Sequence, residues 1–275
     1  MAASYHTRSN SLPSRHHPIT CEVDQHLSRL IASEFTSMSS SSIINQIYSL
    51  QELHDCVDKL LQLSLARQLK QSVDELLNGS LRLLDICSIA KDALLQTKES
   101  VQGLQSIFRR RRTDDIELTS EVTKFLTSRK ALKKTIQKAL KNLKGIKSQK
   151  SSPISDEHET KATISMLREV EAVTFKVIES LLSLISGPRA SSKLSIISKL
   201  MQPKKVACEE TDITEFQKVD AELSSIVSYK TSKSDNIQNQ LKKLELNVQD
   251  LKERLESLTR HLINTRVSLL NIINN

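Results

Sequence analysis

Apolar residues recur at intervals of three and four positions along most of the chain, which is the spacing of one face of an α-helix. The pattern predicts a first helix from about Thr20 and a second from about Ile43, with Ser42 as the N-cap of the second. A further apolar stretch spans residues 81–108, and Gly79 is a candidate interruption of the helix that leads into it. The first half of the chain is therefore predicted to consist of consecutive amphipathic helices.

Two more helices are predicted in the middle of the chain. One is expected at about 114–147, with many lysines on its polar side, and the other at about 156–186. The segment 148–157 is rich in serine and contains a proline, so it is predicted to be a linker. Gly187-Pro188 should end the second helix, because glycine suits the C′ position and proline cannot continue a helix.

The most regular pattern lies in a helix predicted at 235–273, where apolar spacings of four and three alternate. This is the a/d seam of a heptad repeat, and it predicts a close helical partner. In a helical domain of this size we favour a partner within the same chain, while pairing with a second copy stays open. The seam consists of Ile237, Leu241, Leu244, Val248, Leu251, Leu255, Leu258 and Leu262.

Composition supports the same fold class. Of the 275 residues, 3% are aromatic, four are glycine and none is tryptophan, so the turns and aromatic strands of a sheet protein are lacking. We expect an all-α protein, an elongated helical bundle with a coiled-coil-like C-terminal helix and a disordered N-terminal tail. The expected parts are a tail at 1–19, helical parts at 20–147 and 158–275, and the linker at 148–157.

Charge and cysteine content bear on the binding partners and the cellular location of the protein. A formal net charge of +8 and a pI of about 9.3 permit association with acidic proteins, anionic lipid or nucleic acid. The four cysteines form no CxxC pair and no apolar signal segment precedes them, so we expect reduced thiols in an intracellular protein. No apolar stretch reaches the roughly 18–20 residues of a transmembrane helix. The cytoplasm is the expected location, with nuclear and membrane-peripheral locations as alternatives.

The residue patterns of catalysis and cofactor binding are not found in the sequence. No GxxxxGK[ST] or GxGxxG motif occurs, and four glycines supply no phosphate-binding loop. His16, His17 and Cys21 lack a second cysteine pair at zinc spacing. His54 and Asp58 stand four positions apart on a helix, where we expect a structural pair. The sequence therefore predicts no enzyme, no cofactor and no metal site.

Basic residues are concentrated in and just before the helix at 114–147. The arginine run before it fits a corner between two helices, and it could add to a nuclear localisation signal. The helix has three interpretations: a solvated face, a surface that docks on anionic membrane or calmodulin, and a surface that follows phosphates. The third is weakened because Phe125 is the only aromatic residue there. The candidate basic surface comprises Arg109, Arg110, Arg111, Arg112, Lys130, Lys133, Lys134, Lys138 and Lys141.

Four blocks of the sequence together resemble a known family. They are SNSLPSRHHP, LLDICSIAKDALLQTKESVQGLQSIFRRRR, RKALKKTIQKALKNLK and LESLTRHLINTRVSLLNIINN. In this order they resemble the BYPASS-related family of plant proteins, over nearly the whole chain. The resemblance implies an all-helical plant protein without known catalytic activity, linked to root and shoot development. It carries no catalytic or ligand-binding residues over to this sequence.

The N-terminal tail contains RSNSLP, which is similar to the mode-one binding motif of 14-3-3 proteins. Its key residues are Arg8, Ser9, Ser11 and Pro13. Phosphorylation of Ser11 would add about −1.5 to −2 charges and three acceptor oxygens, which an arginine cluster can bind. A chance match in a serine-rich tail is the alternative.

The residue patterns predict a non-enzymatic helical interaction protein controlled through Ser11 and 14-3-3 binding. The family resemblance implies a role in plant root and shoot development. The main alternative is a peripheral membrane protein that docks through the basic helix at 114–147. A nucleic-acid-binding protein is the remote alternative. The sequence leaves homo-oligomerisation open.

Overall fold

The computed structural model describes residues 18–33, 39–63, 73–110, 115–145, 158–187, 214–229 and 234–274. Within these ranges every regular element is a helix, which confirms the all-α prediction. The helices are α1 (Pro18–Ser33), α2 (Ser40–Leu61), α3 (Val73–Arg109), α4 (Asp115–Gly145), α5 (His158–Ser186), α7 (Glu215–Tyr229) and α8 (Ser234–Asn274).

Two predicted segments lie outside the described residues. One is the N-terminal tail as far as residue 17, after which α1 already begins at Pro18. The other is the linker at 148–157. The division of the chain into two helical parts stays a prediction.

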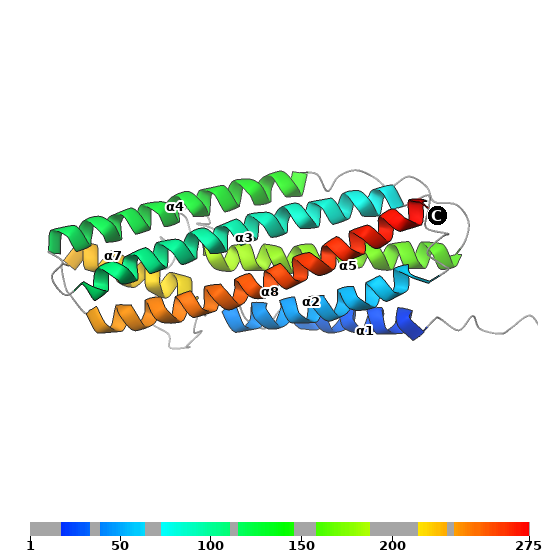
Figure 1. The fold of residues 1–275 in the computed structure, drawn as a ribbon, viewed down its shortest axis with the longest axis horizontal. Coiled ribbons are helices and arrows are strands. Elements are labelled where there is room, and N and C mark those ends of the chain that lie inside the picture. The colour runs from blue at the N-terminus through cyan, green and yellow to red at the C-terminus, as the bar shows by residue number, and fades with distance from the viewer. Residues whose placement is uncertain are drawn as a thin grey trace, which may run out of the picture.

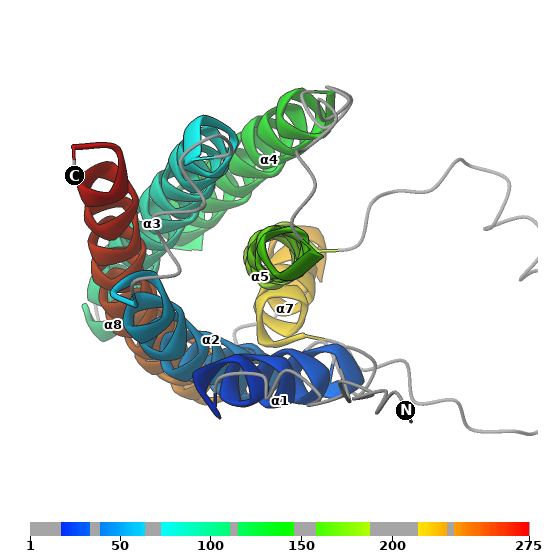
Figure 2. The same cartoon turned by 90° about the vertical axis from the view of Figure 1, so that its right-hand side faces the viewer.

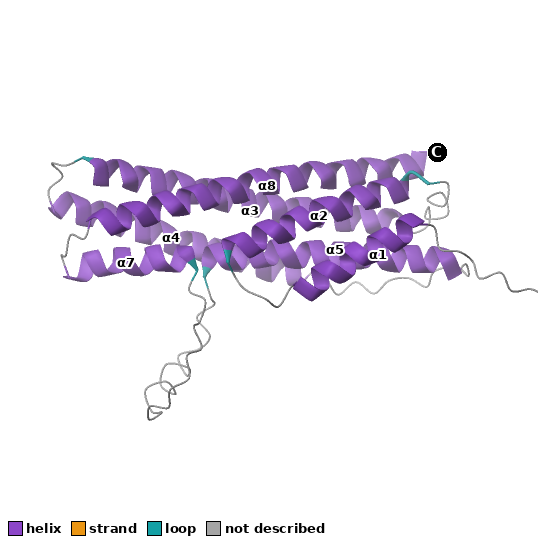
Figure 3. Cartoon of the chain, turned by 90° about the horizontal axis from the view of Figure 1, so that it is seen from below, coloured by secondary structure: helices purple, strands orange, loops and turns teal. Residues whose placement is uncertain are grey.

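The helices form an elongated bundle (Figure 1). Seen from the end, α1, α2, α8, α3 and α4 form a curved row, and α5 and α7 lie on its inner side (Figure 2). Each helix of the row packs on the next, with the most extensive contact between α3 and α8. From below, α5 and α7 lie one after the other along the bundle (Figure 3). The two longest helices, α3 and α8, run alongside α5 and α7 over most of the length of the bundle.

The heptad seam of α8 is buried inside this chain. Its eight residues are all at most 2% exposed, and α8 packs mainly against α3 and α2. The favoured internal partner is thus confirmed, and α3 and α8 run side by side in opposite directions (Figure 1). The described bounds of α8, Ser234–Asn274, differ from the predicted 235–273 by one residue at each end.

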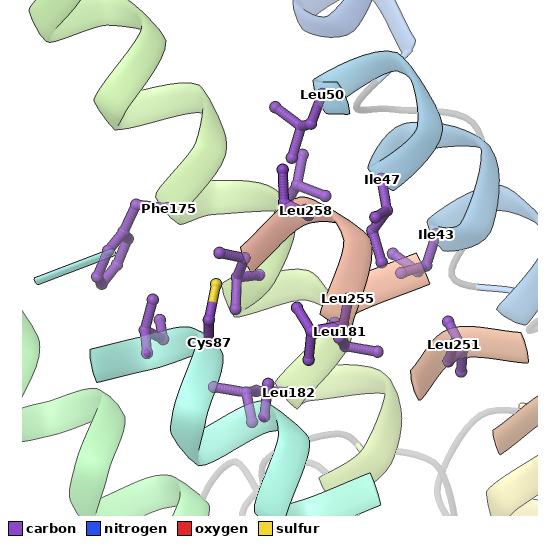
Figure 4. Packing of buried hydrophobic residues seen from close by; sticks show 14 of the residues in the cluster. Ile43, Ile47, Leu50, Cys87, Phe175, Leu181, Leu182, Leu251, Leu255 and Leu258 are labelled. Carbon is purple, nitrogen blue, oxygen red and sulfur yellow. The ribbon is translucent and has the colours of Figure 1, made fainter. Parts of the chain in front are cut away.

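Helix α5 is the centre of the hydrophobic core. It contacts four helices of the row, α1, α2, α3 and α4, so apolar residues are buried around most of its circumference. Figure 4 shows Leu181 and Leu182 of α5 among Ile47 of α2, Cys87 of α3 and Leu255 of α8. The core is continuous along the bundle, and every described helix contributes to it.

Helix α2 begins three residues earlier than its predicted cap implied. Ser39 is the N-cap, and its hydroxyl oxygen accepts a hydrogen bond from the backbone N–H of Ser42 at 3.1 Å. The prediction of Ser42 as the cap was wrong, because four consecutive serines have equal capping chemistry. Ile43, the first buried apolar residue of α2, follows all four serines. The apolar pattern therefore does not reveal which serine starts the helix.

Gly79 does not interrupt α3, which continues through it from Val73 to Arg109. Instead the glycine makes room for a neighbouring helix. A Cβ atom at position 79 would lie 2.1 Å from Oε2 of Glu171 on α5. The Glu171 carboxylate also accepts a hydrogen bond from Arg82 at 2.6 Å. Because Gly79 has no side chain, the Glu171 carboxylate of α5 can lie against the backbone of α3.

The chain leaves α5 and enters α7 at two well-defined caps. Gly187 has a φ of +74° and its N–H bonds the carbonyl of Ser183 at 2.9 Å, which confirms the predicted C′ glycine. Thr214 and Gln217 form a capping box, in which each side chain accepts a hydrogen bond from the backbone N–H of the other. No helix had been predicted at 215–229, although the sequence TEFQ carries this signal.

Candidate functional site

Four lysines form an exposed stripe on α4. Lys130, Lys134, Lys138 and Lys141 are all exposed, and spacings of four, four and three keep them on one side of the helix. The stripe spans roughly 16 Å at about 1.5 Å per residue. Within the described part of the chain, none of the four has a hydrogen bond or an ion pair. Their charges are therefore available to a partner.

Two other basic residues of α4 point the opposite way. The Arg129 side chain is 4% exposed, and its guanidinium contacts the Asp220 carboxylate of α7 and donates to the carbonyl of Ile185 at 2.8 Å. It also lies 5.4 Å from the ring centroid of Phe216. Lys133 reaches the same carboxylate at 2.8 Å. Lys133 thus belongs to an internal ion cluster that joins α4, α5 and α7, rather than to the lysine stripe.

The apolar face of α4 is buried against the other helices of the bundle. Val122, Phe125, Leu132, Ile136 and Leu140 are all at most 6% exposed. An amphipathic helix that lies in a membrane interface buries that face in lipid. In this fold α4 can therefore meet a surface through its lysines, without inserting apolar side chains beside them.

The arginine run is only partly described. Arg109 ends α3 and donates to the side-chain oxygen of Gln105 at 3.3 Å, and Arg110 follows it as an exposed residue. Arg111 and Arg112 lie outside the described residues. The predicted turn between two helices agrees with the end of α3 at Arg109 and the start of α4 at Asp115.

A second polar feature is buried between α2, α3, α5 and α8. His54 is 2% exposed, and its Nε2 lies 3.0 Å from Oγ1 of Thr174. The pKa of His54 is lowered to about 4, mainly because burial disfavours the charged ring and further because His261 lies nearby. The ring is therefore neutral at physiological pH.

The predicted pair of His54 and Asp58 is not formed. Asp58 instead accepts a hydrogen bond from Thr265 of α8 at 2.8 Å, while His54 turns towards α5. Two residues at helical spacing can face different neighbours when each lies at the border between two packed helices. The partners are 120 and 207 positions away, so sequence spacing gave no signal for them.

A cavity of about 40 Å³ adjoins this polar group. Its wall is mostly leucine and valine, and His54, Ser80, Glu171 and Thr265 are its polar members. Arg266 of α8 donates to Oγ of Ser80 at 2.9 Å, which fixes that hydroxyl against α8. Each of the four helices contributes one of these polar side chains to the wall of the cavity.

We also searched the described residues for reactive thiols, metal sites and membrane-spanning helices. Cys21, Cys56 and Cys87 are free thiols, and burial raises the pKa of Cys87 to about 12. Among the described residues there is no cluster of three or more His, Cys, Asp or Glu suited to a metal ion. The described helices also include none that is long and apolar enough to cross a bilayer.

The RSNSLP motif, with Arg8, Ser9, Ser11 and Pro13, lies outside the described residues. Comparison with known proteins gives one finding: residues 46–272 match the family model described as Protein BPS1. The match covers α3, α4, α5, α7 and most of α2 and α8, and so includes the lysine stripe and the residues around the cavity. No curated protein and no solved structure matches the chain.

Proposed function

Because the chain belongs to the BPS1 family of plant proteins, we propose that it is a non-enzymatic helical interaction protein acting in root and shoot development. The observation that carries this proposal is the stripe of four lysines on α4, which have no ion-pair partner among the described residues. Exposed charges without internal partners add nothing to the fold beyond solubility, and they favour an acidic binding partner.

A protein surface suits the stripe better than the alternatives do. Four lysines on an anionic membrane contribute about 1 kcal/mol each, and about 4 kcal/mol corresponds to a dissociation constant near 1 mM. Nucleic acid gains little more, because Phe125 is buried and leaves no aromatic ring on this face for base stacking. A folded partner can add shape complementarity and further contacts to the same four charges.

The second part of the proposal concerns the N-terminal motif. Phosphorylated Ser11, with Arg8 at −3 and Pro13 at +2, would bind a 14-3-3 protein and so control when the bundle meets its partners. The support for this part is the sequence pattern.

Affinity capture from root extract tests the N-terminal motif. The intact protein is compared with Ser11→Ala, and Ser14→Ala serves as a control for loss of a serine in the same segment. We expect 14-3-3 proteins in the eluates of the intact protein and the control, and none with Ser11→Ala. Equal recovery in all three eluates would rule the motif out as a 14-3-3 site.

A charge-matched pair of variants tests the stripe. In the first variant Lys130, Lys134, Lys138 and Lys141 are changed to Gln. The control changes four scattered exposed lysines to Gln, namely Lys59, Lys218, Lys242 and Lys243. Each variant loses the same net charge, so only the arrangement of the charges differs between them.

Both variants are used for capture from root extract and for co-sedimentation with vesicles that contain phosphatidylserine. We expect the stripe variant alone to lose a set of captured proteins. All forms should bind the vesicles only weakly, and the two variants should bind them to the same extent. Vesicle binding that is strong, falls with salt and is lost only in the stripe variant would instead support membrane docking. Identical behaviour of the two variants would show that the stripe has no role of its own.

A further inference from the structure

A groove of about 240 Å³ opens between α3 and α4, which are neighbours at one end of the curved row of helices (Figure 2). Its floor is apolar, because Leu104 of α3 and Phe125 of α4 line it and are at most 5% exposed. Its rim is charged, since Glu121 and Lys124 form an ion pair there and the Lys124 side chain is 69% exposed. An apolar floor within a polar rim is the usual make-up of a protein interface.

Gly103 lines the same groove, and no described neighbour accounts for its missing side chain. The residue is exposed and lies inside α3, and a Cβ atom at position 103 would have no described atom within 4 Å. Gly79 of the same helix differs, because it makes room for Glu171. A glycine inside a helix weakens that helix relative to alanine. At Gly103 the result of this weakening is open space on the surface of the bundle.

The size of the groove fits one large side chain. Pockets for small-molecule ligands measure roughly 300–1,000 Å³ and enclose most of the ligand, whereas this groove is smaller and open to solvent. At protein interfaces, a single anchor side chain that enters such a depression contributes much of the binding free energy. The groove therefore suits an anchor of another protein better than it suits a small-molecule ligand.

The charges of α4 indicate which kind of protein carries this anchor. From Val122 to Gly145 the helix contains no acidic residue, while lysines recur through the whole stretch. Lys124 on the rim and Lys138 of the lysine stripe are separated by about four turns at 3.6 residues per turn, so they lie on the same side of α4. A partner that presents acidic side chains to the stripe can therefore also reach the groove.

We propose that the groove between α3 and α4 is the anchor site for the partner of the stripe, an acidic helix that places one large apolar side chain over Gly103. Acidic side chains of the same helix then lie opposite Lys134 and Lys138. A helix fits because the lysines repeat at helical spacing, which acidic residues on a second helix can match. This inference rests on the proposed function, because it specifies how the partner of the stripe binds.

Two synthetic helical peptides of about 20 residues are the probes, long enough to span the groove and the stripe at about 1.5 Å per residue. Each is rich in alanine and carries glutamates about ten and fourteen positions from a single tryptophan, which matches the positions of Lys134 and Lys138 relative to the groove. The tryptophan stands near the N-terminus in one peptide and near the C-terminus in the other, so both helix directions are covered. The protein itself contains no tryptophan, so the peptide emission reports burial of the indole ring.

Gly103→Leu fills the groove and should leave the fold intact. Leucine raises helix propensity and its Cβ atom meets no described atom, so the free energy of unfolding in urea should not fall. The tryptophan emission should shift to the blue when one of the peptides binds the intact protein. The affinity of that peptide, measured by the anisotropy of a labelled copy, should be about tenfold lower for Gly103→Leu.

Ser106→Leu is the matched control, because Ser106 is an exposed residue of α3 that does not line the groove. It should bind the peptide as tightly as the intact protein does. Equal affinities of Gly103→Leu and Ser106→Leu, or no blue shift of either peptide with the intact protein, would overturn the proposal. Replacing the tryptophan of the peptide by alanine tests the anchor without altering the protein, and an unchanged affinity would likewise count against the groove.

The stripe variant separates this inference from the proposed function. Binding that is lost in the stripe variant but kept in Gly103→Leu overturns the anchor site and supports the stripe as a binding surface. The reverse result supports the anchor site and overturns the role of the stripe. We expect both variants to weaken binding, and added salt to weaken it further through the lysines.

Discussion

At the scale of single residues, the fold depends on a few polar side chains whose partners lie on distant helices. His54 bonds Thr174, Arg129 bonds Asp220, and Glu171 bonds Arg82. In each case a buried or half-buried polar group is held by specific groups on neighbouring helices. Changes at these residues should therefore have effects that charge or hydrophobicity alone would not predict.

His54 should make the protein sensitive to mild acid. Its pKa is about 4 in the folded chain and 6.5 in a model peptide, so between these values the unfolded state binds a proton that the folded state does not. The free energy of unfolding should fall by about 3 kcal/mol as pH drops from 6.5 to 4, at about 1.4 kcal/mol per pKa unit. Urea unfolding at a series of pH values, compared with His54→Leu, measures this loss.

The comparison with His54→Leu removes the contribution of the carboxyl groups, which the two proteins share. The variant should lose less stability over the same pH range. Parallel curves for the two proteins would contradict the prediction.

Removing Asp220 should be far more costly than removing an exposed acid. Asp220→Ala leaves Arg129, whose side chain is 4% exposed, without its counter-ion, and we expect a loss of about 3 kcal/mol in the free energy of unfolding. Glu121→Ala breaks the pair with Lys124, which is 69% exposed, and should cost less than about 0.5 kcal/mol. Thermal or urea unfolding of both variants provides the measurement. Similar small losses would show that α7 is not held by this cluster.

At the scale of helices, the close approach of α3 and α5 depends on a missing side chain. Gly79 lies against the carboxylate of Glu171, which in turn pairs with Arg82. A second pair, Glu75 with Arg168 at 2.6 Å, joins the same two helices further along. Gly79 therefore has a packing role in α3, although the low helix propensity of glycine weakens the helix.

Gly79→Ala should show opposite tendencies in two backgrounds. In the wild type the gain in helix propensity, about 1 kcal/mol, is offset because the new methyl group must displace Glu171 from its place. In a Glu171→Ala background the displaced group is absent, so Gly79→Ala should stabilise by about 1 kcal/mol. A double-mutant cycle by urea unfolding tests this, and equal effects in the two backgrounds would contradict it.

The success of sequence-based prediction also differs between helices. The seam of α8 was predictable because eight apolar positions repeat over more than three heptads. α7 was not predicted, because its 15 residues contain few repeats of the apolar pattern and one capping sequence, TEFQ, does not define a helix by itself. The lysines of α4 looked alike in the sequence, and only the position of Asp220, 87 residues from Lys133, turns that lysine inward. Apolar spacing within a helix can be recognised in a short span of sequence. Ion pairs between residues of different helices depend on the tertiary fold.

At the scale of the whole molecule, the seam of α8 is buried within one chain, so we expect the bundle to be stable without a second copy. Leu255 is fully buried against neighbouring helices of the same chain, so Leu255→Ala should cost about 2–5 kcal/mol. The unfolding midpoint should not depend on protein concentration, as expected for a monomer. Leu246→Ala is the matched control on the same helix, because Leu246 is 62% exposed and its truncation should have little effect. A midpoint that rises with concentration would show that the seam pairs between copies instead.

The caps at Gly187 and Thr214 have a practical consequence. A Cβ atom at Gly187 would lie 3.6 Å from the side chain of Gln217, so the chain leaves α5 and returns to α7 at almost the same point. The end of α5 and the start of α7 are therefore held beside each other by the bundle itself, where Arg129 of α4 contacts both helices. A pair of labels on the two caps would report whether these helix ends stay together when the protein meets a partner.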